Sequence, residues 1–369
     1  MAVAVDYTQV TEVLDRVLSG ERISDADAEA LLRSRDLVRI GRAANELRDR
    51  RNEPGVVTFV VDRNLNYSNI CYTDCSFCAF YRRPGDTREG YTLPRRIIFK
   101  KIEETLDLGG TAVLMQGGHN PDLTIDWYED LFRAIKARYP IHLHALSPSE
   151  VQHIARRSRL TSSETLSRLR DAGLDSLPGG GAEILVDRVR KVISPKKTTS
   201  DEWLSIMRAA HRLGMSTTAT MMWGHVETLE ERVEHLRRIR DLQDEMNGFR
   251  AFISWTYQPD HTALAPQVTW HPTSFDYLLM QAVTRIYLDN VEHIQSSWVT
   301  QGTKIGQVAL FFGADDLGSV MMEENVVSAA GTTYRATTED FLHLIRNAGY
   351  RPRQRDTLYR TVREYSAAA

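Results

Sequence analysis

From residue 55 onward, short apolar runs rich in β-branched residues alternate with longer amphipathic stretches. The stretches have the residue spacing of helices, and several of them end at glycine, which commonly follows a helix. Strands that alternate with helices predict parallel βαβ units. The eight runs that predict strands are 56–61, 111–116, 141–146, 174–185, 215–222, 250–257, 291–297 and 307–312.

Eight parallel strands are the number that closes an α/β barrel. The sequence therefore predicts an α/β fold in which residues 55–350 form a (β/α)8 TIM-type barrel; a doubly wound open sheet is the alternative. Residues 1–54 carry Leu and Val at helical spacing and are expected to form an N-terminal helical extension, with Ser24 as a helix cap. Residues 351–369 are expected to be a C-terminal tail.

Polar and glycine-rich segments fall where the predicted strands end, which is where such barrels place their chemistry. These segments are NYSNICYTDCSFC after the first run, QGGHN after the second, SPSE after the third, PGGGAE within the fourth, GHVE after the fifth, QPDH after the sixth and GADDLG after the eighth.

The chain of 369 residues has a formal net charge of -3, with basic and acidic residues interspersed. This pattern is typical of solvated helix faces, so we expect neither a nucleic-acid nor a membrane partner. No apolar run is long enough to span a membrane. Residues 1–20 lack the basic flank and apolar core of a secretory signal, so the expected location is cytoplasmic.

The chain has three cysteines, Cys71, Cys75 and Cys78, in the spacing C-x3-C-x2-C. Three thiolates can ligate three irons of a cubane 4Fe-4S cluster, which leaves the fourth iron open to a chelating cofactor. Electron-transfer clusters use four cysteines, and this chain has no fourth. A zinc site would more often show paired C-x2-C units or histidines, and three unrelated buried cysteines are the other alternative.

The cysteine spacing, with Phe77 directly before Cys78, resembles the loop of the radical S-adenosylmethionine (SAM) superfamily. The resemblance implies a 4Fe-4S cluster held by the three cysteines and SAM bound to its open iron through the methionine amino and carboxylate groups. It also implies one-electron cleavage of SAM to a 5′-deoxyadenosyl radical, with the electron supplied by a reducing protein such as flavodoxin or ferredoxin.

The same resemblance assigns cofactor contacts to the other strand ends. Gln116, Gly117 and Gly118 would hold the methionine amino group, because glycine lets backbone approach a ligand closely. Ser147 and Glu183 would contact the ribose or the methionine, although Glu183 could instead cap a helix. Lys196 and Lys197 are candidate cations for the methionine carboxylate, with a solvated loop as the more usual explanation.

A radical reaction that ends in rearomatisation needs a base that removes a proton. His119 stands where the superfamily usually has an acidic residue after the two glycines, and it could instead face the substrate. The sequence does not choose among the candidate acid–base groups, which are His119, His225, His293, Asp315, Asp316, Glu323 and Glu324.

Longer segments resemble one group within this superfamily, the cyclic dehypoxanthinyl futalosine synthases of the futalosine route to menaquinone. These segments are NICYTDCSFCAFYR, QGGHNPDL, LHALSPSE, LPGGGAEILVDRVR, TATMMWGHVET and GADDLGSVMMEENV. The resemblance implies that the radical abstracts the sugar C4′ hydrogen of dehypoxanthine futalosine. The carbon radical then adds to the benzoate ring, and loss of a proton and an electron restores aromaticity.

The alternatives within the superfamily are aminofutalosine synthase and the deazaflavin-forming FO synthase subunits, which resemble the same loop and barrel. Sulfur-inserting relatives such as biotin synthase need cysteines for a second cluster, and this chain has none to spare. A noncatalytic iron–sulfur carrier is the alternative from a different class.

Overall fold

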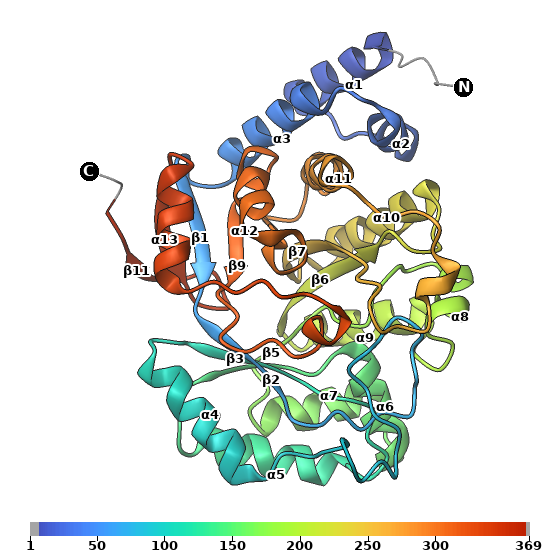
Figure 1. Cartoon of the computed structure of the whole chain (residues 1–369), viewed down its shortest axis with the longest axis vertical. Helices are drawn as coiled ribbons and strands as arrows, with labels where there is room; N and C mark the ends of the chain where they lie inside the picture. Colours follow the sequence, from blue (N-terminus) through green and yellow to red (C-terminus); the bar gives the residue numbers. More distant parts are fainter. Residues whose placement is uncertain (1–6, 367–369) are drawn as a thin grey trace.

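The computed structural model describes residues 7–366, so the first six residues of the predicted extension and the last three of the predicted tail lie outside it. Three helices open the described chain: α1 (Tyr7–Ser19), α2 (Asp25–Arg33) and α3 (Leu37–Arg51). The predicted cap is confirmed, because Ser24 and Asp27 form a capping box at the start of α2. Helices α2 and α3 pack on α10 (Leu229–Met246) and α11 (Ser274–Tyr287), outside the barrel (Figure 1).

One mixed sheet of eleven strands forms the centre of the molecule. Its order is β11-β10-β1-β9-β8-β7-β6-β5-β4-β3-β2, and every pair is parallel except β10 with β11. The strands are β1 (Val56–Val60), β2 (Asp62–Asn66), β3 (Ala112–Gln116), β4 (His142–Ala145), β5 (Ser176–Leu177), β6 (Ser216–Trp223), β7 (Phe249–Thr256), β8 (His293–Gln295), β9 (Asp316–Ser319), β10 (Arg351–Arg355) and β11 (Thr361–Glu364).

Strands β1 and β2 act as one bent strand, because only Val61 separates them. The first half pairs with β9 and the second half with β3, so the curled sheet returns to the strand from which it began. The backbone of Val320 and Met322 continues this contact by donating to the carbonyl oxygens of Val60 and Asp62. Counted this way, β1–β2 and β3 to β9 occupy eight barrel positions, and the predicted α/β barrel fold is confirmed.

The predicted strand at 307–312 is wrong. Residues Trp298–Val308 form α12, and a short 3-10 helix, η2 (Ala309–Phe311), follows it. A short apolar run does not distinguish a buried strand from the buried end of a helix. The eighth barrel position belongs to β9, so GADDLG leads into a strand rather than following one, and its carboxylates lie at the opposite end of the barrel from the one expected.

Helices surround the sheet, and many begin at a threonine whose side chain closes a capping box (Figure 1). The helices not yet placed are α4 (Arg95–Asp107), α5 (Ile125–Lys136), α6 (Pro148–Ser158), α7 (Ser162–Asp171), α8 (Asp187–Ile193), α9 (Ser200–Arg212) and α13 (Thr338–Asn347), with 3-10 turns η1 (Ala265–Gln267) and η3 (Ser328–Ala330). None of the helices between residues 7 and 366 is long and apolar enough to cross a membrane.

The segment predicted as a tail contributes the hairpin β10–β11 to the sheet, beside β1. The hairpin turn carries Thr357 and Tyr359 to the amino ends of the barrel strands, where both side chains line the central cavity. Domain boundaries at 54 and 350 stay a prediction.

Candidate active site

The barrel encloses a cavity of about 300 Å³, here called the barrel cavity. Its wall is made of inward-facing side chains from successive strands, among them Asn64, Leu114, His144, Thr220 and Trp255. Loops at the carboxyl ends of the strands cover one end of this cavity, and the β10–β11 turn covers the other. Most of the surface that the wall exposes to the cavity is apolar, although many of the lining side chains carry a polar group, and this combination is typical of a small-molecule site.

The cysteine loop follows β2 at the carboxyl end of the barrel. Cys71 and Cys75 are buried, Cys78 is half-buried, and all three thiols are free. Backbone hydrogen bonds from separate parts of the chain fix the loop: Ser76 N donates to Ile193 O over 2.9 Å, and Leu264 N donates to Ser76 O over 2.8 Å. The thiols are therefore held on a rigid support rather than on a mobile loop.

The donor set of this loop fits a cluster better than a single metal ion. Within residues 7–366, no three His, Cys, Asp or Glu side chains are grouped so that they could hold one ion. Three thiolates that each bind a different iron of a cubane do not need to converge in that way. Burial raises the pKa of Cys75 to about 12 and also raises that of Cys78, so the thiolates need bound cations to stabilise them.

The QGGH loop lies directly against the cysteine loop, and its glycines make this approach possible. A Cβ on Gly117 would lie 2.5 Å from the Tyr67 ring. A Cβ on Gly118 would lie 2.2 Å from the carbonyl oxygen of Ile70 and 2.7 Å from the Cβ of Cys71. The predicted cofactor segment and the predicted cluster ligands therefore lie against each other, and their roles as cofactor contacts stay a prediction.

Glu150, which the sequence analysis did not single out, holds this site together from the first turn of α6. Its Oε1 accepts hydrogen bonds of 2.9 Å from both Gly117 N and the Tyr67 hydroxyl. Its Oε2 accepts one of 2.7 Å from the Ser147 hydroxyl, and Ser147 caps α6. Burial raises the pKa of Glu150 to about 7. The Ser147 hydroxyl therefore contacts Glu150 in this structure, and the predicted contact of Ser147 with the cofactor stays a prediction.

Glu183 and Lys197 form a buried ion pair beside the cysteine loop. Lys197 Nζ lies 3.0 Å from Glu183 Oε1, and Arg190 Nη1 lies 3.4 Å from Oε2. Although burial lowers it, nearby Glu183 and Cys75 raise the pKa of Lys197 overall. Lys197 Nζ also lies 5.1 Å from the centre of the Phe77 ring. Two cations therefore share one carboxylate, and the excess positive charge suits an anionic ligand group.

The two candidate lysines differ sharply in their surroundings. The side chain of Lys197 is only 15% exposed, whereas that of Lys196 is 50% exposed and pairs with Asp74 over 2.8 Å. The solvated-loop explanation therefore holds for Lys196 and fails for Lys197.

Two of the candidate bases are histidines at the carboxyl end. His119 is buried, its ring stacks on that of His153 at 5.1 Å, and burial lowers its pKa well below the ordinary value. His225 is also buried, and both of its ring nitrogens are engaged: Nδ1 accepts from Val226 N over 2.8 Å, and Nε2 lies 3.0 Å from Met222 O. The hydrogen bonds of His225 leave no ring nitrogen for a substrate.

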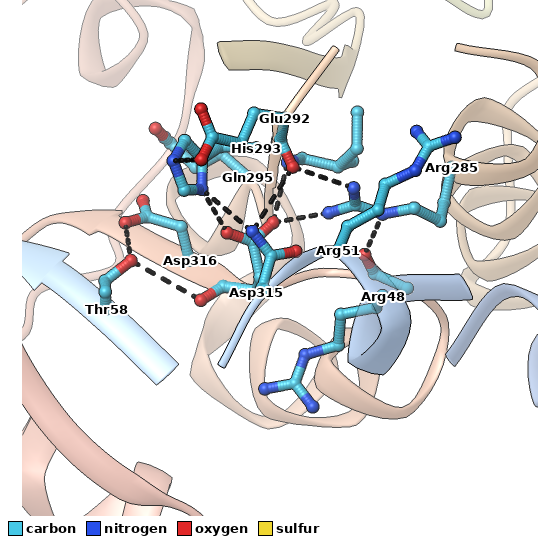
Figure 2. Close-up of polar contacts among 12 residues, drawn as sticks. Arg48, Arg51, Thr58, Arg285, Glu292, His293, Gln295, Asp315 and Asp316 are labelled. Carbon is cyan, nitrogen blue, oxygen red and sulfur yellow. Dashed lines mark hydrogen bonds and ion pairs between the residues drawn. The ribbon is translucent and has the colours of Figure 1, made fainter. Parts of the chain in front are cut away.

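Asp315 and His293 lie in a polar network at the amino end of the barrel (Figure 2). Asp315 accepts a hydrogen bond from the buried Arg285, one of 2.8 Å from Ile294 N and one of 2.6 Å from His293 Nδ1. Although burial raises it, His293 and Arg285 lower the pKa of Asp315 to about 2 overall. This carboxylate is a poor proton acceptor that supports the floor of the barrel.

Asp316 belongs to the same network (Figure 2). It accepts from Arg355 Nε over 2.5 Å and Nη2 over 2.8 Å, and from the Thr58 hydroxyl over 2.5 Å. A bidentate arginine pair of this kind is strong and geometrically fixed. The arrangement therefore favours a structural role for Asp316, at the end of the barrel opposite the cysteine loop.

Glu323 and Glu324 lie on the loop after β9. Glu323 pairs with Lys101 over 2.5 Å and with Arg63 over 3.1 Å. Glu324 lines the barrel cavity, but its carboxylate accepts from three successive backbone N–H groups at the start of η3. Of the two, only Glu324 borders the place where a substrate would bind.

Asp62 and His144 are titratable groups in the barrel cavity that the sequence analysis missed. Asp62 accepts a hydrogen bond from Ser319, and burial raises its pKa to about 6. His144 Nδ1 lies 2.6 Å from Ser176 Oγ. A sequence signal did exist for His144, because alternate residues of a strand share one face and IHLHAL places two histidines at that spacing.

A barrel that carries three cysteines on the loop after its first strand, with a glycine segment packed on them, defines a class of radical enzymes. The sequence matches the family model "Radical SAM superfamily" over residues 65–239 and "CofH/MqnC C-terminal region" over residues 246–368. Together with the full-length relatives below, these matches show that the chain belongs to the radical SAM superfamily. It is a radical SAM enzyme whose cofactors are a 4Fe-4S cluster and SAM.

Individual relatives narrow the comparison from the superfamily to particular enzymes. Cyclic dehypoxanthine futalosine synthase from Halalkalibacterium halodurans is 49% identical, with 96% of this chain and 95% of that protein covered. The protein of the same name from Streptomyces coelicolor is 47% identical, with coverage of 94% and 87%. Aminodeoxyfutalosine synthase from Thermus thermophilus is 39% identical, with 95% of each chain covered.

Among solved structures, the FeFe-hydrogenase maturase HydG from Carboxydothermus hydrogenoformans has the same fold. The TM-score is 0.75 at 15% identity, with 96% of this chain and 81% of that chain covered. At this identity the likeness supports the barrel fold and nothing finer.

Proposed function

We propose that this chain is a cyclic dehypoxanthine futalosine synthase, which cyclises dehypoxanthine futalosine in menaquinone biosynthesis. The observation that carries the proposal is near-full-length identity of 49% and 47% to two proteins of that name, against 39% to an aminodeoxyfutalosine synthase. The cysteine count agrees, because three cysteines suffice for one cluster with an open iron and exclude a second cluster.

The residues of the site have distinct tasks under this proposal. Cys71, Cys75 and Cys78 hold the cluster, and Gly117 with Gly118 let the backbone approach the methionine group of SAM. The cluster and SAM, when bound, supply the 5′-deoxyadenosyl radical that removes the C4′ hydrogen. Lys197 supplies a cation for the methionine carboxylate.

The barrel cavity binds the substrate and excludes water from the radical. Thr218, Thr220 and Gln295 line it and offer hydrogen bonds to a sugar, while Trp255 and Trp298 offer flat apolar surface to an aromatic ring. The hairpin turn with Tyr359 closes the amino end, so that the C4′ radical meets the attached ring rather than solvent.

The proposal includes two finer expectations. The electron comes from flavodoxin or ferredoxin, and the reaction takes place in the cytoplasm. Replacing chemical reductant with each purified donor protein tests the first, and fractionation of cells that produce the chain tests the second.

Anaerobic turnover of the reconstituted protein tests the main proposal. The protein is incubated with SAM, reductant and, separately, dehypoxanthine futalosine and the substrates of aminofutalosine synthase and of the FO synthase subunit. We expect mass analysis to show the cyclic product from dehypoxanthine futalosine only. The Cys75→Ala variant should lose both the cluster and the activity. Product from one of the other substrates would contradict the proposal and indicate the corresponding enzyme. A cluster that forms without any 5′-deoxyadenosine would indicate a noncatalytic iron–sulfur carrier.

A further inference from the structure

Two histidines and a serine form a hydrogen-bonded chain along one face of the barrel wall, because His142 and His144 are two residues apart on β4. Ser176 Oγ on β5 lies 2.6 Å from His144 Nδ1 and 2.6 Å from His142 Nε2, both on β4. The pairing of His144 with Ser176 across the two strands creates this geometry, because it places the serine between residues two apart on its neighbour.

The two ends of this hydrogen-bonded chain, His144 and His142, lie in different cavities. His144 lines the barrel cavity, and because its Nδ1 contacts Ser176, its Nε2 is the ring nitrogen that remains for a group inside that cavity. His142 lines a second cavity of about 410 Å³, here called the amino-end cavity, with Thr111, Asp175 and Asp356. Its lining residues come from the amino ends of β3, β4 and β5 and from the C-terminal hairpin.

We infer that His144, Ser176 and His142 form a proton relay that carries the proton lost on rearomatisation out of the barrel cavity to the amino-end cavity. This inference rests on the proposed function, because a cyclisation onto an aromatic ring is the step that releases such a proton. The relay leads away from the cysteine loop, so proton release does not require the cofactor end of the barrel to open.

The relay carries one proton, and the ring radical gives up one electron. The ring C–H bond breaks, and its proton bonds to His144 Nε2. His144 Nδ1–H passes its proton to Ser176 Oγ, the serine hydroxyl passes its own to His142 Nε2, and His142 releases Nδ1–H to water. The ring radical also gives one electron to a one-electron acceptor of the iron–sulfur class, which replaces the electron spent on cleaving SAM. Net, substrate and SAM become cyclic product, 5′-deoxyadenosine, methionine and one proton, with no external oxidant.

The groups around the two histidines favour a concerted proton transfer over a charged imidazolium intermediate. Burial, with smaller contributions from His142 and Arg355, lowers the pKa of His144 to about 3. Burial also lowers the pKa of His142, with Asp175 and Asp356 opposing this and Lys136 and Arg360 reinforcing it. A neutral chain that accepts a proton at one end as it releases one at the other never places a full charge on His144 in the dry cavity.

Among residues 7–366, three carboxylates line the barrel cavity, but Glu183 is paired with Lys197 and Arg190 and Glu324 accepts from three backbone N–H groups, so Asp62 is the main competing acceptor. It accepts a hydrogen bond from the Ser319 hydroxyl, so this contact offers no further acceptor to which a proton could pass. Asp62 would have to release its proton back into the cavity, whereas the relay has a separate exit.

Removal of the serine hydroxyl tests the relay. In Ser176→Ala, hydrogen abstraction precedes the blocked step, so the first turnover should still yield one 5′-deoxyadenosine per enzyme. Formation of cyclic product should fall about a hundredfold, as for loss of an acid–base group. Ser176→Thr keeps a hydroxyl and should retain most of the activity. Ser216→Ala is the matched control, because Ser216 pairs with Ser176 on the adjacent strand and contacts Arg250 instead.

Chemical rescue distinguishes proton transfer from a structural role. The His142→Ala variant should be slow, and free imidazole should restore product formation through the amino-end cavity, with a solvent deuterium isotope effect that varies with the imidazole concentration. Thermal melts of each variant show whether it is folded.

The outcomes separate the two claims. Wild-type enzyme that forms no cyclic product contradicts the proposed function. Wild-type enzyme that forms it while Ser176→Ala is as fast contradicts the relay alone. A folded Ser176→Ala that is slow together with a His142→Ala that imidazole does not rescue also contradicts the relay. A loss of product confined to Asp62→Asn assigns the proton to Asp62 and overturns the inference.

Discussion

Gly118 lies so close to Cys71 that a methyl group on its Cα would lie 2.7 Å from the cysteine Cβ. The cluster ligands and the glycine segment are therefore packed as one unit. Each loop constrains the position of the other, and a change in the glycine should disturb the iron site although it touches no iron.

Gly118→Ala should lower iron content after reconstitution and reduce 5′-deoxyadenosine formation about a hundredfold, as expected for a displacement of about 1 Å at a reacting centre. Iron analysis and product quantification measure both effects. Gly214→Ala is the control: Gly214, unlike Gly118, has a positive φ, but no atom lies within 4 Å of its added Cβ. The Gly214→Ala variant should lose about 1 kcal/mol of stability and retain its iron. Equal iron content in the two variants would contradict the packing argument.

Lys197→Met should weaken SAM binding about tenfold to a hundredfold, because a buried charge-assisted contact is lost. Equilibrium binding of SAM to the reconstituted protein measures the change. Lys196→Met is the matched control on the adjacent residue, where the side chain is 50% exposed and pairs with Asp74. Similar affinity in both variants would show that Lys197 does not contact the cofactor.

Glu150→Gln should flatten the dependence of stability on pH. Burial raises the pKa of Glu150 from 4.5 to about 7, so its contribution to stability is fully present below about pH 4.5 and is lost as the pH rises through 7. The wild type should therefore lose about 3 kcal/mol more than the variant over this interval. Urea denaturation of both proteins at several pH values measures it, and parallel profiles would contradict the prediction.

Asp316→Asn should destabilise the fold by about 3–5 kcal/mol, because it removes the charge that balances a buried guanidinium. Asp316 is fully buried and Arg355 is 4% exposed, so solvent cannot replace the lost partner. Denaturant midpoints measure the loss. Glu245→Gln removes an exposed partner of Arg208 and should leave the midpoint unchanged. A stable Asp316→Asn that has lost activity would return Asp316 to the list of catalytic candidates.

The cysteine loop could be predicted because its information is local. Three ligands within eight residues, one aromatic neighbour and a preceding strand specify the site without any distant contact. The glycine segment was equally visible, since each barrel strand delivers its following loop to the same end.

The error at the eighth strand had a larger effect than one misplaced element. Placing the strand at 307–312 assigned Asp315 and Asp316 to the carboxyl end, whereas the pairing of β9 with β1 and β8 puts them at the floor. The apolar run at 307–312 carries no signal that separates the two arrangements. Which strand completes a barrel depends on pairing partners far away in the chain.

The same limit explains why Asp62 and His144 were missed. Asp62 belongs to no motif and His144 is one of eight residues in LHALSPSE, and each becomes a cavity residue only because the bent strand β1–β2 closes the ring. Glu150 was hidden for a related reason, because its partners Tyr67 and Gly117 come from two other loops.

The support of the cysteine loop also has a consequence for how the enzyme matures. All three thiols are synthesised early, but the carbonyl of Ile193 and the amide of Leu264 that fix Ser76 come much later in the chain. A growing polypeptide that ends before Ile193 carries every iron ligand and lacks both of these supports. The rigid support of the cysteine loop is therefore complete only after synthesis has passed Leu264.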